Sequence, residues 1–419
     1  MTNQEIHRYH NTGPRFFYGY IVVIAACFIM VVSWAVYNSF GVFFKPLVTE
    51  FGWTSAMTSG AFSLSMIIYG VLGIVVGGLN DRFGPRIVVT LCGILTGIGY
   101  LLMSQVNGIW QLYLFYGIII GVGMSGVWVP QLSTVARWFI SRRTLMTGIV
   151  IAGAGIGQLI GPPVITRLLA VYEWRMTFVI LGALVLVLVV ITAQFLSREP
   201  SQKGQRPYGE DTERQAGVET EPIVYSLKEA ACTAQFWLSF GMFVCVGYGF
   251  FSIVVHIVPH AIELEIPAVE AATILSAMGG VSIFGNYLLG GIADRIGNRQ
   301  VFLICFVLMA VALFGLVPVR EMWAFYLFAV AFGCVMGGAG AAESPMVARL
   351  FGLSSHGLIY GVVHLGFTVG AAIGPFVTGY IFDVTDGYQT AFLVCGAFSI
   401  IGIILTLVLR PTRRLGGKI

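Results

Sequence analysis

Charged side chains are scarce in this sequence of 419 residues: Asp, Glu, Lys and Arg together make up 10% of it, whereas 57% is hydrophobic. The mean hydropathy is +0.88. A soluble protein needs far more polar surface than this, so the composition excludes an ordinary water-soluble globular protein. Lipid must be the solvent, and the net charge of +4 gives no indication of nucleic-acid binding.

Cysteines and recognisable catalytic motifs are also sparse. The 7 cysteines are scattered through or beside apolar runs without C-x-x-C spacing, so neither a disulfide framework nor a metal site is indicated. The sequence contains no phosphate-binding loop, no zinc-ligand spacing and no Ser/His/Asp arrangement in a recognisable context. We therefore expect no cofactor, no metal and no enzymatic activity.

Long apolar runs dominate the chain instead. A run of about 20 residues crosses roughly 30 Å of hydrocarbon, and a search for such runs predicts twelve spans. No convincing cleavage site follows the first run, so we interpret it as a retained helix. The predicted spans are 17–44, 55–79, 86–104, 109–136, 145–166, 176–196, 234–258, 271–292, 300–318, 322–347, 358–382 and 389–409.

Basic residues are distributed unevenly between the two sides of these spans. With both termini placed in the cytoplasm, 19 of the 23 Lys and Arg residues fall in cytoplasmic segments. The others are Lys45, Arg167, Arg175 and Arg320. Since positive charge concentrates on the cytoplasmic side, this predicts a multi-pass inner-membrane protein with both termini in the cytoplasm.

The sequence repeats itself across its two halves. "GGLNDRFGPR" (77–86) returns 213 positions later as "GGIADRIGNR". At the same offset, Gly148, Gly153, Gly157, Gly161 and Pro162 align with Gly361, Gly366, Gly370, Gly374 and Pro375. "VARWF" (135–139) and "VARLF" (347–351) align at an offset of 212. The repeat predicts six-helix bundles at 17–196 and 234–409, a polar cytoplasmic linker at 197–233, and cytoplasmic tails at 1–16 and 410–419.

The predicted fold class is therefore an all-α integral membrane protein with twelve transmembrane helices in two six-helix pseudo-symmetric halves. A parallel six-plus-six repeat is typical of transporters that rock two bundles about a midplane site. Gly-x-x-x-Gly spacing in spans five and eleven lets helices approach closely, although any single glycine could serve packing alone.

The repeated phrase resembles the signature of the major facilitator superfamily, Gly-x-x-x-Asp-Arg/Lys-x-Gly-Arg-Arg, with Pro85 and Asn298 as departures. The resemblance implies a conformational latch, in which an acid and bases at the cytoplasmic ends of helices pair and face helix termini. We call the matching residues the latch: Gly77, Asp81, Arg82, Gly84, Arg86, Gly290, Asp294, Arg295, Gly297 and Arg299.

Two further stretches, 37–47 and 137–153, resemble those of monocarboxylate transporters and oxalate/formate exchangers. This resemblance implies movement of small organic monocarboxylates, often with a proton. The chain departs from that pattern at three positions where family members carry Lys or Arg: Asn38, Asn286 and Phe367 stand there. Every cationic substrate anchor that the resemblance leads us to expect is neutral.

Three ionisable residues lie inside the predicted spans, where a charge is costly and marks a candidate functional site. Glu343, whose counterpart in the first half is Gln131, is a candidate for substrate or proton coupling. Alternatively it is a structural carboxylate, either bonded to a neighbouring helix or pairing with Arg137 or Arg349 at the gate. His256 is a coupling candidate or an interfacial polar anchor. His364 is a substrate candidate or a packed histidine bonded to a carbonyl.

Polar and aromatic residues of several spans complete the predicted substrate cavity, although each aromatic alone could be packing. The candidates are Trp34, Tyr37, Asn38, Trp128, Gln131, Gln158, His256, Asn286, Tyr287 and His364.

The sequence leads to one principal hypothesis and two alternatives. We expect a monomeric secondary active transporter that moves a small organic anion, a monocarboxylate above all, by alternating access, with possible proton coupling. The first alternative is a drug/proton antiporter, since the glycines and Pro162 of span five resemble an exporter motif. The second is a non-transporting nutrient sensor on the same fold. Substrate identity, direction and coupling ion stay open.

Overall fold

The computed structural model describes residues 16–53, 55–210, 225–385 and 387–410, and nearly all of them are helical. Within these residues, twelve helices are long and apolar enough to cross a membrane. They confirm the twelve predicted spans. The helices of the first half are α2 (Gly19–Tyr37), α3 (Phe40–Phe51), α4 (Ser55–Phe83), α5 (Pro85–Met103), α6 (Ile109–Leu112), η2 (Tyr113–Ile120), α7 (Gly121–Met124), α8 (Val129–Trp138), α9 (Arg143–Val171) and α10 (Trp174–Ala193). Those that follow are η3 (Pro200–Lys203), α12 (Leu227–Ala231), α13 (Ala234–Glu263), α14 (Ala268–Ile296), α15 (Asn298–Leu316), α16 (Met322–Phe351), α17 (His356–Thr385) and α18 (Gln389–Val408).

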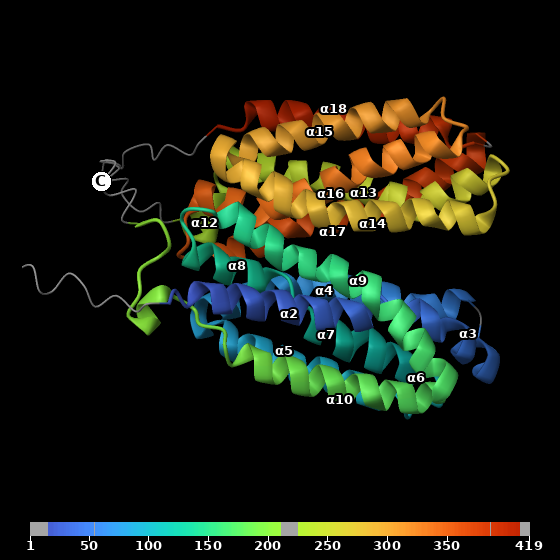
Figure 1. The fold of residues 1–419 in the computed structure, drawn as a ribbon, viewed down its shortest axis with the longest axis horizontal. Helices are drawn as coiled ribbons and strands as arrows, with labels where there is room; N and C mark the ends of the chain where they lie inside the picture. Colours follow the sequence, from blue (N-terminus) through green and yellow to red (C-terminus); the bar gives the residue numbers. More distant parts are fainter. Residues whose placement is uncertain (1–15, 54, 211–224, 386, 411–419) are drawn as a thin grey trace, which may run out of the picture.

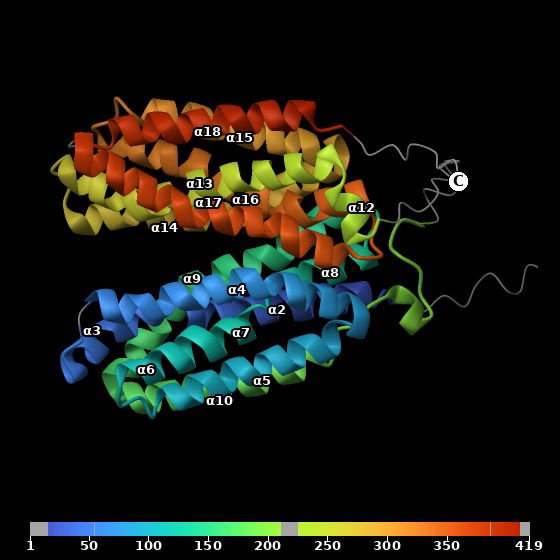
Figure 2. The same ribbon diagram turned by 180° about the vertical axis from the view of Figure 1, so that it is seen from behind.

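The long helices form two bundles that lie side by side, and in both bundles the helices run along the long axis of the molecule (Figures 1 and 2). Helices α2–α10 make the N-terminal half, and α13–α18 make the C-terminal half. Helix α2 begins and α18 ends at the same end of the molecule, on the left in Figure 1. We call this the terminal end and the opposite one the far end. The two halves are those that the repeat predicts.

Glycine stripes bring helices into close contact within each half. A side chain added at Gly157 of α9 would collide with the backbone of Val31 on α2, and one added at Gly370 of α17 would collide with the backbone of Val244 on α13. The Gly-x-x-x-Gly prediction is therefore confirmed as a packing device in both halves.

The most extensive contacts between the halves are those of α9 with α14 and of α4 with α17. At the first crossing Gly148 approaches the backbone of Asn286. At the second, a Cβ at Gly361 would stand 2.8 Å from the Cα of Ile74. The two crossings are related by the sequence repeat, because Gly148 and Gly361 are equivalent positions.

The first part of the polar linker, residues 197–210, is folded against the N-terminal half, and we call it the linker strap. The backbone N–H of Tyr208 donates to the carbonyl of Trp138 (2.9 Å), and its carbonyl accepts from Ile140 and Ser141 (both 3.0 Å). The Tyr208 ring packs among Phe17, Tyr20 and Phe139. Residues 211–224 lie outside the described part of the chain.

Because the Tyr208 ring is the apolar anchor of the linker strap, Tyr208→Ala is expected to lower the free energy of unfolding by about 1–2 kcal/mol. Tyr208→Phe keeps the ring contacts and is the matched control. Thermal unfolding of the purified protein measures both variants. Equal melting temperatures for Tyr208→Ala and wild type would mean that the strap does not stabilise the bundle.

Candidate substrate and proton site

A buried carboxylate lies where the two halves meet, about two turns before the end of α16. Glu343 of α16 is 2% exposed. One of its oxygens, Oε2, accepts a hydrogen bond from the Tyr360 hydroxyl (3.1 Å) and lies 3.0 Å from Nδ1 of His364. Tyr360 and His364 are one turn apart on α17, so a single helix face supplies both partners. The cluster is a carboxylate–histidine pair supported by a phenol.

The N-terminal half reaches this cluster through Trp128. The indole Nε1–H donates to the Tyr360 hydroxyl (3.1 Å), and the ring stacks on His364 with the centroids 5.8 Å apart. Trp128 stands just before α8, where the chain between α7 and α8 leaves the helix. Pro130 has no N–H for the carbonyl of Gly126, which favours a break at this point. The break positions Trp128 against the other half.

Aromatic rings surround the cluster on the N-terminal side. Trp34 of α2 makes edge contacts with Trp128 (5.9 Å between centroids), Tyr69 (6.2 Å) and Tyr37 (5.9 Å). Its indole nitrogen is buried and has no hydrogen-bond partner among the described residues. On the C-terminal side Phe367 stacks on His364. The site thus combines one carboxylate, one histidine, an aromatic wall and an unused N–H donor.

A small cavity of about 10 Å³ lies among α4, the start of α8 and α17, lined by Tyr69, Trp128, Gly361 and His364 with neighbouring small residues. A space of this size holds a water molecule at most. A substrate bound at this position would therefore require the surrounding side chains or the halves to move.

The structure brings together four of the residues predicted from the sequence, and these are Trp34, Trp128, Glu343 and His364. Glu343 pairs with His364 rather than with Arg137 or Arg349. The predicted gate pairing is therefore wrong: Arg137 bonds Asp81 (2.6 Å) instead, and Arg349 lies beside Gly297.

The two histidines of the predicted spans, His256 and His364, have contacts that differ from expectation. His256, the predicted coupling residue, places Nε2 3.0 Å from the carbonyl of Pro375 and Nδ1 3.4 Å from the Tyr388 hydroxyl. Among the described residues no carboxylate contacts it. His364, which could have bonded a carbonyl, instead meets Glu343. The three-dimensional packing therefore moves the coupling candidate from His256 to His364.

The other predicted cavity residues lie around or away from the cluster. Tyr37 stands behind Trp34, with its hydroxyl 3.1 Å from Oγ of Ser65. Gln131, one turn after Trp128, is fully buried, and neither polar atom of its side chain has a partner among the described residues. Asn38 ends α2 and is half-buried.

Asn286, Gln158 and Tyr287 do not touch the cluster. Asn286 donates to the carbonyl of Ser282 (3.0 Å) at the crossing of α9 and α14. Gln158 is exposed beside Leu159. Tyr287 is 63% exposed next to Leu288, which is 58% exposed, so it lies on an exposed face of α14 and not in an enclosed cavity. This placement corrects the prediction for Tyr287.

Sequence reasoning missed three residues of this region: Tyr69, Tyr360 and His356. Tyr360 and His356 precede His364 by one and two helical turns, and this spacing of four residues was a usable signal. Tyr69 carries no such signal, because an isolated tyrosine in a span is ordinarily packing.

The latch closes the terminal end by capping helices across the interface. Asp81 of α4 accepts from the backbone N–H groups of Gly357 and Leu358 (both 3.0 Å) in the first turn of α17. Asp294 of α14 accepts from Thr144 (2.8 Å) and its neighbour Leu145 (2.9 Å) in the first turn of α9. Each acid therefore binds the positive end of a helix in the opposite half.

The latch glycines have two separate roles. Gly84 and Gly297 adopt φ of 83° and 99°, a left-handed backbone that favours glycine at the turn after each acid. Gly77 and Gly290 allow the capped helix to come close: a Cβ at Gly290 would stand 3.0 Å from the carbonyl of Thr144. Both motifs therefore encode a turn and a close approach.

The basic residues of the latch have different contacts in the two halves. Arg299 donates to the carbonyls of Thr406 (2.9 Å) and Leu407 (2.7 Å) at the end of α18. Arg82 lies over the ring of Phe83. The remaining two, Arg86 and Arg295, are exposed.

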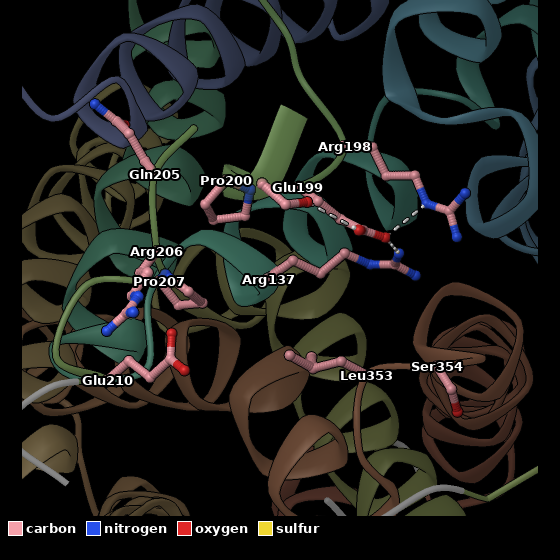
Figure 3. A pocket seen from close by; sticks show the side chains of 11 residues that line it. Arg137, Arg198, Glu199, Pro200, Gln205, Arg206, Pro207, Glu210, Leu353 and Ser354 are labelled. Atoms are coloured by element: carbon pink, nitrogen blue, oxygen red, sulfur yellow. Dashed lines mark hydrogen bonds and ion pairs between the residues drawn. The ribbon is translucent and has the colours of Figure 1, made fainter. Parts of the chain in front are cut away.

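Among the described residues only the Asp81 side of the latch contains an ion pair to its acid, and Arg137 supplies it. Its side chain is 6% exposed and bonds Asp81 (2.6 Å), and it lies 3.5 Å from Glu199 of the linker strap. Figure 3 shows Arg137 and Arg198 converging on Glu199 in a pocket of about 420 Å³, with Leu353 and Ser354 of the C-terminal half on the opposite side. Among the described residues Asp294 has no ion-pair partner.

Two six-helix bundles related by a sequence repeat, with a carboxylate–histidine pair enclosed between them and helix caps closing one end, define a membrane transporter. The family model described as Major Facilitator Superfamily matches residues 26–300 and 263–418. The chain belongs to the Major Facilitator Superfamily. It is a multi-pass membrane transporter and not an enzyme.

Relatives and solved structures agree with this assignment. The chain is 27% identical to the mouse protein "Monocarboxylate transporter 12", covering 94% of this chain and 86% of that protein. It is 29% identical to the rat protein "Monocarboxylate transporter 13", covering 93% and 89%. The fold matches that of the E. coli fucose:proton symporter (TM-score 0.71, 14% identity, 95% of this chain and 100% of that one) and of a proton:xylose symporter (TM-score 0.74, 12% identity, 94% and 97%).

Proposed function

We propose that the protein is a secondary active transporter that carries a small organic monocarboxylate together with a proton. The substrate class is supported by relatives named as monocarboxylate transporters over most of their length. The observation that carries the proton is the buried pair of Glu343 and His364 at the meeting point of the halves. A buried ionisable pair of this kind is the feature expected of a coupling site.

The charge balance of this site suits a carboxylate and a proton moving together. In the closed site the carboxylate of Glu343 and an imidazolium at His364 would neutralise each other. When a proton binds Glu343, the imidazolium loses its partner and can pair with the carboxylate of a substrate. Since one negative and one positive charge enter together, the occupied site is as neutral as the empty one, and neither charge is buried alone.

Neutral donors would complete the substrate site. The unused indole N–H of Trp34 offers a hydrogen bond to a second substrate oxygen. The rings of Trp34, Trp128 and Phe367 would contact the short apolar part of the substrate. In this proposal His364 takes the place of the Lys and Arg anchors that are absent at Asn38, Asn286 and Phe367.

The test is uptake of radiolabelled lactate or pyruvate into proteoliposomes containing the purified protein. We expect accumulation driven by an inward proton gradient, abolished by an uncoupler, and faster at pH 5.5 than at pH 7.5. The absence of carboxylate uptake at every pH would refute the substrate class.

A second candidate, export of an organic cation in exchange for protons, is favoured by one observation. Glu343 lies beside an aromatic wall of Trp34, Tyr69 and Trp128, and aromatic rings with a carboxylate are a typical environment for a bound cation. Proton-driven movement of tetraphenylphosphonium, without movement of carboxylates, would establish this alternative.

His364→Gln is expected to remove the rise of uptake at low pH, whereas His256→Gln should keep the wild-type profile. His364 contacts Glu343, while His256 bonds a backbone carbonyl away from the cluster. This reverses the order expected from the sequence alone. The measurement is initial uptake between pH 7.5 and 5.5, with the uncoupler as a control for the gradient. A flattened profile for His256→Gln alone would show that the coupling residue is His256 after all.

We further propose that the terminal end faces the cytoplasm of a bacterial-type cell, as the distribution of basic residues predicts. Cys232 lies exposed next to α12 at that end, so an impermeant maleimide should label it only from the cytoplasmic side. A Thr49→Cys variant, exposed on α3 at the far end, should be labelled only from outside. The opposite pattern would invert the topology.

A further inference from the structure

A second buried histidine lies between the central cluster and the latch. His356 is the first residue of α17 and is 0% exposed. Its ring stacks on Tyr360 at 5.7 Å, and Nε2 lies 3.0 Å from Oγ of Ser344, the neighbour of Glu343 in sequence. The next two residues, Gly357 and Leu358, donate the N–H groups that Asp81 accepts. His356 therefore touches both the site and the gate.

The hydrogen bonds around His356 fit a neutral ring. Ser344 Oγ lies 3.3 Å from the carbonyl of Leu132 in the other half and donates to it. Since that bond uses the hydroxyl hydrogen, Nε2–H of His356 is the donor to Oγ. Nδ1 is buried without a partner among the described residues. In an imidazolium Nδ1 would carry a second buried N–H with nothing to accept it, which is costly.

The charges around His356 also disfavour its protonation while the gate is closed. Arg137 of α8 and Arg143 of α9 are near enough to repel a positive ring. The N-terminus of α17 carries partial positive charge of its own. The acids of neighbouring elements are already engaged, Asp81 by α17 and Arg137, and Glu343 by Tyr360 and His364.

We propose that His356 is the proton-sensing residue of the terminal gate: it is neutral while the latch is closed, and it binds a proton when the halves part and admit water at that end. A proton bound only by the open state stabilises that state by mass action. Acidification at the terminal end should therefore favour opening there. The proposal does not depend on the substrate being a carboxylate or on the role of Glu343 and His364.

The size of the effect follows from the ordinary titration of histidine. If His356 titrates near pH 6.5 when solvated and stays neutral when closed, a fall from pH 7.5 to 5.5 raises the open-to-closed ratio about tenfold. The closed latch is favoured most above that range, and its population relative to the open state falls as pH falls through it.

Spin labels across the pocket of Figure 3 can measure this ratio. Ser201 of the linker strap and Ser354 of the C-terminal half both line the pocket, and both are exposed. Labels on Ser201→Cys and Ser354→Cys, in a Cys232→Ser background, report the separation of the halves in the full-length protein in lipid nanodiscs. We expect longer distances to gain about tenfold in relative population between pH 7.5 and 5.5.

Four variants decide the outcome. His356→Gln, and His356→Asn if the first does not fold, should show a ratio that no longer changes with pH. His256→Gln and His364→Gln should keep the wild-type response. A wild-type response in both His356 variants would overturn the proposal, as would loss of the response in His364→Gln alone. Failure of carboxylate uptake with an intact response at His356 would instead refute only the proposed substrate.

Discussion

Glu343→Gln is expected to abolish proton-driven accumulation of the substrate. Glutamine can still accept from Tyr360 and lie beside His364, so the fold should persist, but it cannot bind a transferable proton. A hydrogen bond to a charged group contributes about 1.5–3 kcal/mol, so the initial rate of gradient-driven uptake should fall roughly 10- to 100-fold. The measurement is uptake into proteoliposomes with an imposed pH gradient.

Two controls separate coupling from general damage. Exchange of labelled for unlabelled substrate needs no net proton movement, so Glu343→Gln should retain it. Glu321→Gln, at the exposed N-terminal end of the same helix α16, should behave as wild type. Undiminished gradient-driven accumulation in Glu343→Gln would exclude Glu343 as the proton site. Loss of both accumulation and exchange would assign it to substrate binding or folding.

Asp81→Asn is expected to open the terminal end much more than Asp294→Asn, although the two acids occupy equivalent positions of the repeat. Both lose charge-assisted bonds to two N–H groups. Only Asp81 also neutralises a buried arginine, and breaking a buried ion pair costs about 3–5 kcal/mol. Glu199 lies 3.5 Å from Arg137 but is 43% exposed, so it compensates only weakly for the lost charge of Asp81.

The populations of open and closed states can be measured with the spin-label pair on residues 201 and 354. Adding Arg137→Met to Asp81→Asn should restore part of the closed population, because it removes the unpaired buried charge. The substrates that compete for uptake should stay the same in all these variants, since the latch does not touch the central cluster. Equal effects of the two single variants would mean that Arg137 contributes nothing to the latch.

Much of the architecture is predictable from the sequence because it depends on properties local to each segment. Apolar runs of about 20 residues fix the twelve spans. The repeat at an offset of 213 fixes the two halves, and the recurring glycines mark their close helix contacts. The presence of glycine at positions 84 and 297 is likewise explained locally, because the turn after each latch acid needs a left-handed backbone there.

The candidate site was only partly predictable. The cost of burying a charge identified Glu343, His256 and His364 as candidates. It does not indicate which groups these side chains contact. Which histidine meets the carboxylate depends on how α16 and α17 are rotated against each other, and the spacing along one helix does not contain that rotation. His256 lies on a face of α13 that packs against α17 near Pro375, and it therefore bonds a carbonyl.

The sequence by itself determined that the chain is a two-half membrane protein with a latch in each half, because hydropathy, repeat and turn geometry act over short stretches. Only the tertiary structure decided which groups those stretches bring together. It places Trp128 of one half on Tyr360 of the other, and Asp81 on the first turn of α17. These contacts join residues more than 200 positions apart, and their formation depends on the packing of whole helices rather than on any local pattern.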